Sequence, residues 1–200
     1  MEKYIVIALL TILWVYLLRV LDRAKLNFWL FMVGSAGLFI LMMLLVRPIM
    51  TEPLAKAVAA IAGVFGNLTG WFTPYFKYGI LFVNAASGPM TLQINFECSG
   101  IIEIMAYLSL LSFFRVYTRS ERAAVAVIGI LGIIMSNVVR IIVICSMIYF
   151  GGSDLYYLAH TIVGRLVFYA LTVVLYFYVF TKPHIVRMKV GKFSYGDSTK

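Results

Sequence analysis

Long runs of apolar residues, separated by short clusters of charged ones, make up most of the chain. A run of about 18 or more largely uncharged residues has the length of a helix that crosses a hydrocarbon layer of roughly 30 Å. The alternating segments of an outer-membrane barrel do not occur. The pattern predicts an all-α integral membrane protein, a polytopic helical bundle with about five spanning helices, at residues 4–21, 28–46, 99–114, 123–150 and 160–181.

The run at residues 123–150 is longer than a bilayer needs. At about 1.5 Å per residue its helix exceeds a hydrocarbon layer of roughly 30 Å. We expect this helix to tilt, to bend near Gly129 and Gly132, or to protrude from the membrane.

Residues 49–98 differ in kind from the spans around them. Residues 49–71 repeat apolar positions at helical spacing beside Lys56, which predicts an amphipathic helix, either at the membrane surface or packed on the bundle. Residues 72–96 are aromatic and interrupted by proline and glycine, and residues 80–83 fit a short strand or a re-entrant turn. We expect this region to lie on the exoplasmic surface, over the bundle.

Composition agrees with a membrane protein. Hydrophobic residues make up 63% of the chain, charged residues 12%, and the mean hydropathy is +0.98, which no water-soluble core accommodates. The net charge of +9 would suggest a nucleic-acid partner in a soluble domain, but here the basic residues flank the apolar runs. We therefore expect one integral membrane domain over residues 1–200, in a lipid bilayer and without a nucleic-acid partner.

The basic residues also predict the orientation. Lysine and arginine near span ends concentrate in cytoplasmic loops. One set of loops holds eleven of them and the opposite set holds four, so we expect the richer set, with the tail 182–200, to be cytoplasmic. The N-terminus and the beginnings of the spans near Cys98 and His160 then lie on the exoplasmic side of the plasma membrane. The richer set is Arg19, Arg23, Lys25, Arg115, Arg119, Arg122, Lys182, Arg187, Lys189, Lys192 and Lys200, and the poorer set is Lys3, Arg47, Lys56 and Lys77.

The polar sequence Glu97-Cys98-Ser99-Gly100 stands where the third span begins. Unpaired N–H groups at a helix start favour a thiolate, which makes Cys98 a candidate nucleophile. Ser99 can cap the helix, and Gly100 lets another group approach the backbone. The alternative is that Cys98 is simply a small buried residue.

Two arginines lie inside predicted spans, Arg140 and Arg165. A guanidinium there is costly unless it faces the bundle interior with partners, so such residues are functional candidates. For Arg140 the structural alternatives are an ion pair with Glu103 or a side chain that extends to the interface. Glu103 and Arg165 lie at similar depth below Cys98 and His160, and we expect them to form a buried pair.

Cys98, Arg140 and His160 together supply what acyl transfer needs: a thiol nucleophile, a cation for the oxyanion, and an imidazole base or acid. Each alone has a plainer interpretation, and His160 alone is typical of a membrane interface. We expect the three to converge in one exoplasmic cavity covered by residues 72–96. Cys145 stands among apolar residues and is expected in the core, and no metal-ligand spacing is present.

The chain resembles the exosortase/archaeosortase family over residues 96–181, because it has three motifs in the family's order. They are Glu97-Cys98-Ser99-Gly100, then Asn137-Val138-Val139-Arg140 inside a later span, then Ala159-His160. The resemblance implies a membrane cysteine protease or transpeptidase, with Cys98, Arg140 and His160 catalytic and Glu97, Ser99, Asn137, Glu103 and Arg165 supporting. It also implies exported protein substrates whose C-terminal tail has a short motif, a hydrophobic helix and a basic cluster. The tail would be cleaved through a thioester without cofactor or metal. Many family members have more N-terminal spans, so the substrate motif does not carry over.

Two other functions use some of the same residues. A transporter or channel would also need intramembrane Arg and Glu, and would depend on Glu103 or Arg165 rather than on Cys98. A non-catalytic assembly scaffold would bind partners through the aromatic surface region. A disulfide between Cys98 and Cys145 would disable the nucleophile.

Overall fold

The structure, a computed structural model, describes residues 2–85 and 88–182. A continuous helix runs over Ser153–Thr181, because α6 continues at both ends through π-helical turns. In chain order the elements are α1 (Glu2–Arg23), α2 (Asn27–Leu45), α3 (Arg47–Thr69), β1 (Phe72–Tyr75), β2 (Ile80–Ala85), β3 (Gly88–Gln93), α4 (Ile101–Phe113), α5 (Arg119–Gly151) and α6 (Gly164–Tyr176).

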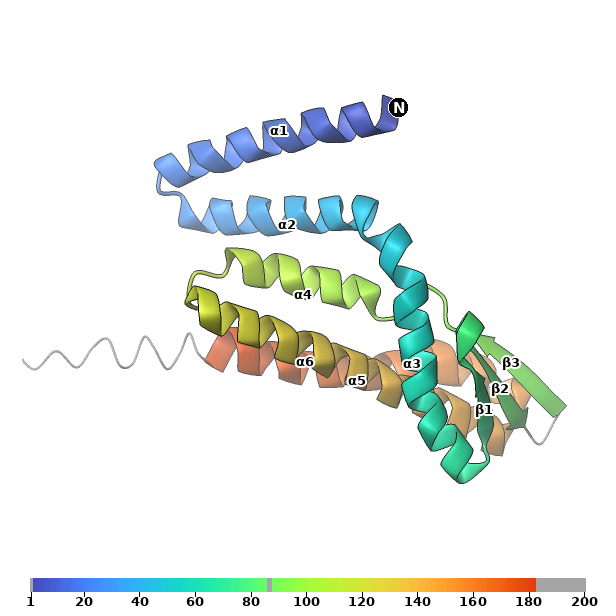
Figure 1. The fold of residues 1–200 in the computed structure, drawn as a ribbon. Coiled ribbons are helices and arrows are strands. Elements are labelled where there is room, and N and C mark those ends of the chain that lie inside the picture. The colour runs from blue at the N-terminus through green and yellow to red at the C-terminus, as the bar shows by residue number, and fades with distance from the viewer. Residues whose placement is uncertain (1, 86–87, 183–200) are drawn as a thin grey trace, which may run out of the picture.

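Helices α1, α2, α4, α5 and α6 lie roughly alongside one another, and successive ones run in opposite directions (Figure 1). Five helices in the described part are long and apolar enough to cross a membrane: α1, α2, α3, α5 and Ser153–Thr181. This confirms the polytopic helical bundle with about five such helices. These five differ in one member from the five predicted spans. The predicted span 99–114 forms α4, which has only 13 residues, about 20 Å of helix, whereas α3, predicted as an amphipathic helix, has 23 residues.

Helix α5 is the longest element and reaches past α2 and α4 to the sheet (Figure 1). It begins with a capping box, in which Thr118 and Glu121 bind each other's backbone N–H groups, and it ends at Gly152, whose φ of 73° stops the helix. Its 33 residues make about 50 Å, which is longer than a hydrocarbon layer of roughly 30 Å. Near its C-terminal end, Ile144 and Ile148 belong to the core cluster that also contains Leu81 and Val83 of the sheet.

Strands β1, β2 and β3 form an antiparallel sheet in that order. Of the two expectations for residues 80–83, the strand is the one that forms, and it extends over Ile80–Ala85. Helix α3 crosses the other long helices at a steep angle beside this sheet (Figure 1). Gly63 and Gly66 permit the close approach, since a Cβ on them would lie 2.3 Å from Pro74 and 2.5 Å from the Phe72 carbonyl.

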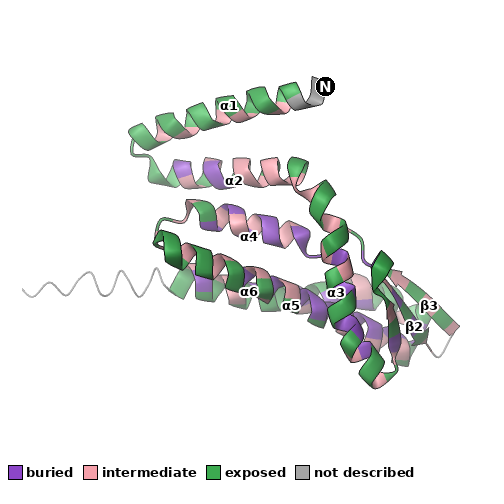
Figure 2. Ribbon diagram, in the orientation of Figure 1, coloured by how far each residue is buried: buried purple, intermediate pink, exposed green. Residues whose placement is uncertain are grey.

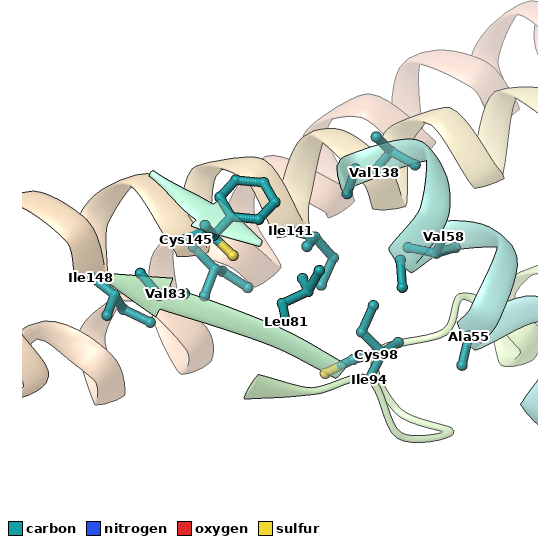
Figure 3. Close-up of a cluster of buried hydrophobic side chains, with 14 of the residues drawn as sticks. Ala55, Val58, Leu81, Val83, Ile94, Cys98, Val138, Ile141, Cys145 and Ile148 are labelled. Atoms are coloured by element: carbon teal, nitrogen blue, oxygen red, sulfur yellow. The ribbon is translucent and has the colours of Figure 1, made fainter. Parts of the chain in front are cut away.

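The main core lies between α3, the sheet and the C-terminal half of α5 (Figures 2 and 3). A second cluster joins α4, α5 and the last helix around Tyr107 and Phe168. Helix α1 lies mostly exposed and rests on α2, where Trp14 donates a hydrogen bond to the Val33 carbonyl at 3.0 Å. The end of the bundle that carries the sheet is therefore the best-packed part of the described chain.

Candidate active site

A tight turn ahead of α4 holds Cys98. The side-chain oxygen of Asn95 accepts hydrogen bonds from the backbone N–H groups of Glu97 and Cys98, each at 3.2 Å. An asparagine that binds the backbone just after it stabilises such turns. Cys98 is 3% exposed and lies at the border of the main core, beside Ile94 (Figure 3), whereas Glu97 is exposed.

Gly100 ends this turn in a conformation that other residues rarely adopt. Its φ is 80°, and it occupies the cap position of α4. Asn137 of α5 packs beside it and donates a hydrogen bond from Nδ2 to the Cys98 carbonyl at 2.7 Å. The backbone of the cysteine is thereby fixed to α5, and Asn137 is fully buried.

Ser99 does not cap α4, contrary to the expectation from the sequence. Gly100 takes that position, and no side-chain hydrogen bond caps the helix. The Ser99 hydroxyl instead donates to the Phe96 carbonyl at 3.0 Å and accepts only a long bond, 3.4 Å, from the Ile101 N–H. Ser99 thus braces the turn, and Cys98 lies two residues before the helix cap.

His160 reaches Cys98 from the last helix. Its Nε2 lies 3.0 Å from the Cys98 Sγ, and its ring stacks on Tyr156 with centroids 5.6 Å apart. The prediction that a helix starts at His160 is wrong, because helical structure begins at Ser153 and His160 lies in the π-helical turn Leu158–Val163. The extra residue in a π turn re-aims neighbouring side chains, and such turns are frequent at functional sites.

Arg140 approaches the same sulfur from α5. Its Nη2 lies 3.7 Å from the Cys98 Sγ, and its Cζ lies 5.7 Å from the centre of the Phe168 ring. The side chain is 4% exposed, takes part in none of the ion pairs found among the described residues, and has a buried Nε with no hydrogen-bond partner there. The ion pair with Glu103 is therefore not formed, and the cation faces the thiol.

Burial raises the pKa of the Cys98 thiol, and the positive charge of Arg140 is the largest influence that opposes it. The net direction is upward, so the thiol is protonated at neutral pH. A helix start that favours a standing thiolate, as the sequence suggested, is not supported. A reaction at this sulfur needs a base to remove the proton, and the imidazole of His160 is within hydrogen-bond reach.

The predicted buried pair of Glu103 and Arg165 is wrong. Arg165 is exposed, Glu103 is half-buried, and neither belongs to an ion pair found in the described part of the chain. Gly164 and Phe168 are the buried positions of this part of α6. Since successive residues of a helix point about 100° apart, Arg165 lies at the edge of this buried face, and its charge is a minor influence that lowers the pKa of Cys98.

Both cysteines are free thiols. Cys145 is fully buried among apolar residues of the main core, as expected. The disulfide that would have disabled Cys98 is therefore not formed. Within residues 2–85 and 88–182, no three His, Cys, Asp or Glu side chains lie close enough together to hold a metal ion.

Three side chains that support the site were not identified from the sequence. Tyr156 stands four residues before His160, a spacing that indicates a shared helix face, but only the π turn shows that the rings stack. Phe168 lies under Arg140, and Arg47 of α3 places its Cζ 3.8 Å from the centre of the Phe96 ring, next to the Cys98 turn. The contacts of Phe168 and Arg47 join distant segments, so no local pattern indicates them.

A family model described as a transmembrane exosortase (Exosortase_EpsH) matches residues 2–178. The chain belongs to this exosortase family. No curated protein and no solved structure is similar enough to the chain to count as a match. The exosortase match begins in α1, so it reaches far N-terminal of residue 96, and it ends at residue 178. It implies a multi-pass membrane protein that processes protein substrates at a membrane.

Proposed function

We propose that this exosortase-family chain is a cysteine protease or transpeptidase that cleaves the C-terminal sorting tails of exported proteins at the exoplasmic face. The observation that carries the proposal is the meeting of Cys98, His160 and Arg140 from three separate segments, with sulfur–nitrogen distances of 3.0 and 3.7 Å. A thiol, an imidazole and a cation at such distances form a constellation for acyl transfer.

The first step is the transfer of the Cys98 proton to Nε2 of His160. The thiolate attacks a substrate carbonyl carbon, a C–S bond forms, and the carbonyl oxygen becomes an oxyanion. The guanidinium of Arg140, held in apolar surroundings and without a carboxylate partner among the described residues, stabilises that oxyanion. Its fixed position favours the transition state because no solvent has to reorganise there.

The second step breaks the C–N bond. His160 returns its proton to the leaving amine, which departs with the hydrophobic tail, and the exported part remains on Cys98 as a thioester. An amine, a lipid headgroup or water then attacks the thioester carbonyl and gives its proton to His160. The C–S bond breaks, and the proton passes from His160 to the Cys98 sulfur, which restores the thiol. Asn137 and Gly100 contribute by holding the Cys98 backbone still during both steps.

Co-expression with a tail-bearing protein tests the proposal. We expect mass spectrometry to find the substrate shortened near its motif with the wild-type chain, and intact with Cys98→Ala. Cys145→Ala is the matched control, because it removes the other thiol, which lies in the core, and should leave cleavage in place. Cleavage by Cys98→Ala at the wild-type level would return the chain to the transporter or scaffold classes.

A further inference from the structure

Strand β3 is an edge strand that leads directly to the proposed nucleophile. Its packing partner is β2, whereas the opposite edge of the sheet, β1, lies against α3. Four residues separate the end of β3 at Gln93 from Cys98. A free strand edge is a template on which another extended chain can pair.

The register determines which backbone groups of β3 are open. The Ile94 N–H donates to the Gly79 carbonyl at 2.8 Å, so Ile94 points its backbone groups toward β2. Since antiparallel strands alternate inward and outward residues, Thr91 and Gln93 direct their N–H and C=O groups away from β2. In the described part of the chain, no hydrogen bond to these four outward groups is found.

Pro89 occupies the next outward position along β3. It has no N–H to offer, which limits pairing to the half of the strand nearest Cys98. The side chains of Thr91 and Gln93 are exposed, while those of Met90 and Leu92 are half-buried against the main core. The edge therefore presents a short set of backbone donors and acceptors beside an apolar border.

We propose that the extended segment of the protein substrate, just before the bond to be cleaved, pairs with the open edge of β3 as a fourth strand. This rests on the function proposed above. The segment would run parallel to β3, because its exported part must lead away from the bundle while its tail helix enters the membrane near Cys98. Main-chain pairing would give affinity. The face of the sheet that carries Met90 and Leu92 would select substrates with small or apolar side chains in the paired segment.

Proline substitution tests the pairing on purified full-length protein, with a substrate first identified by the Cys98→Ala comparison. Thr91→Pro removes an outward N–H, and Pro89 demonstrates that this strand accepts proline at such positions. Thr91→Ala measures what the loss of the side chain does by itself. We expect KM to rise about tenfold further in Thr91→Pro than in Thr91→Ala, with kcat little changed.

Peptide inhibitors provide a test that does not depend on the folding of a variant. Synthetic peptides that copy the segment before the cleaved bond, each with one N-methylated residue, compete with substrate on the wild-type chain. Only alternate N–H groups of a paired strand face β3, so we expect inhibition to be lost at every second position. Equal inhibition along the whole peptide would overturn the proposal.

The outcomes separate the two hypotheses. If Cys98→Ala cleaves like wild type, the proposed function fails. If Cys98→Ala is inactive while Thr91→Pro and Thr91→Ala share one KM, only the pairing on β3 fails. It also fails if Thr91→Pro abolishes a dimer in solution and leaves cleavage unaltered, because the edge would then join two copies of the chain.

Discussion

Cys98 illustrates how burial sets the chemistry of a single residue. A sulfur at 3% exposure keeps its proton, because the thiolate loses its hydration there and Arg140 only partly compensates. In the proposed mechanism, the same burial would protect a thioester from stray water. The thiol would then react only when His160, 3.0 Å away, takes its proton.

The rate of Cys98 alkylation by iodoacetamide measures this raised pKa. The thiolate is the reactive form, and a raised pKa places its appearance above the ordinary thiol value of about 8.5, so the rate should climb through pH 7–9 without a plateau. Arg140→Gln removes the charge that lowers the pKa, and its profile should shift to still higher pH. Cys98→Ala supplies the background from Cys145. A plateau below pH 7 would instead indicate a standing thiolate–imidazolium pair.

Alanine substitutions at Gly100 and Gly70 test whether the turn that holds Cys98 has a specific role in the site. Both have positive φ, 80° and 74°, so alanine at either should lower the free energy of unfolding by about 1–2 kcal/mol. Gly70 ends α3 with open space around it, whereas Gly100 packs beside Asn137 and adjoins the Cys98 turn. Thermal unfolding should change alike in both variants, and substrate cleavage should fall only in Gly100→Ala. Equal losses of cleavage would mean that the turn has no special part in the site.

The sequence allowed the three residues of the site to be named, but not their contacts. Cys98, Arg140 and His160 are chemically distinctive, and their order along the chain resembles the family. At about 1.5 Å per residue, the ten residues from Arg140 to Phe150 put Arg140 about 15 Å from that end of a straight helix, which is too far to touch a cysteine at the surface. In the structure the two residues do meet, because Asn137 holds the Cys98 turn against the middle of α5. The rest of α5 continues beyond this contact and packs along the sheet. Such a contact depends on packing between distant segments.

At the scale of elements, α3 and the sheet form one packed unit on the end of α5. Apolar runs predicted the long helices well, because membrane spans carry a strong local signal. The local sequence signal for the three-stranded sheet and for the direction of α3 is weak. Strand pairing depends on residues far apart in the sequence, and the direction of α3 depends on small residues at close contacts. The structure shows why residues 63 and 66 are glycines: Pro74 and Phe72 lie where a side chain would be.

Gly66→Ala should test that unit. A Cβ there would lie 2.5 Å from the Phe72 carbonyl, a backbone atom that cannot move without displacing β1, and overpacking of this kind costs about 1–3 kcal/mol. Gly132→Ala is the control, because its Cβ would meet only the flexible end of Leu175 at 3.2 Å and alanine favours a helix. We expect the melting temperature in detergent to fall for Gly66→Ala and to hold or rise for Gly132→Ala. A stable Gly66→Ala would mean that the contact between α3 and β1 is loose.

At the scale of the whole molecule, the charged loops and the candidate site lie at opposite ends. The N-terminus of α1 and the sheet are at one end of the bundle, and the turn between α1 and α2, the start of α5 and the end of the last helix are at the other (Figure 1). The second end holds Arg115 paired with Asp22, and Arg122, which donates to the carbonyls of Ser112 in the last turn of α4 and of Phe114 just after it. This separation is what a bundle with one cytoplasmic and one exoplasmic end requires.

Cysteine accessibility in intact cells tests the orientation on which the proposed function depends. Asp154→Cys and Arg119→Cys place an exposed thiol at the two ends of the bundle, in a chain that also carries Cys98→Ser and Cys145→Ser. With eleven basic residues on one set of loops and four on the other, the loop near Asp154 should be exoplasmic. A membrane-impermeant maleimide should then label Asp154→Cys in intact cells, and Arg119→Cys only after permeabilisation. The reverse pattern would place Cys98 and His160 toward the cytoplasm, where the tail of an exported protein is not presented for cleavage, and would remove the basis of the proposed function.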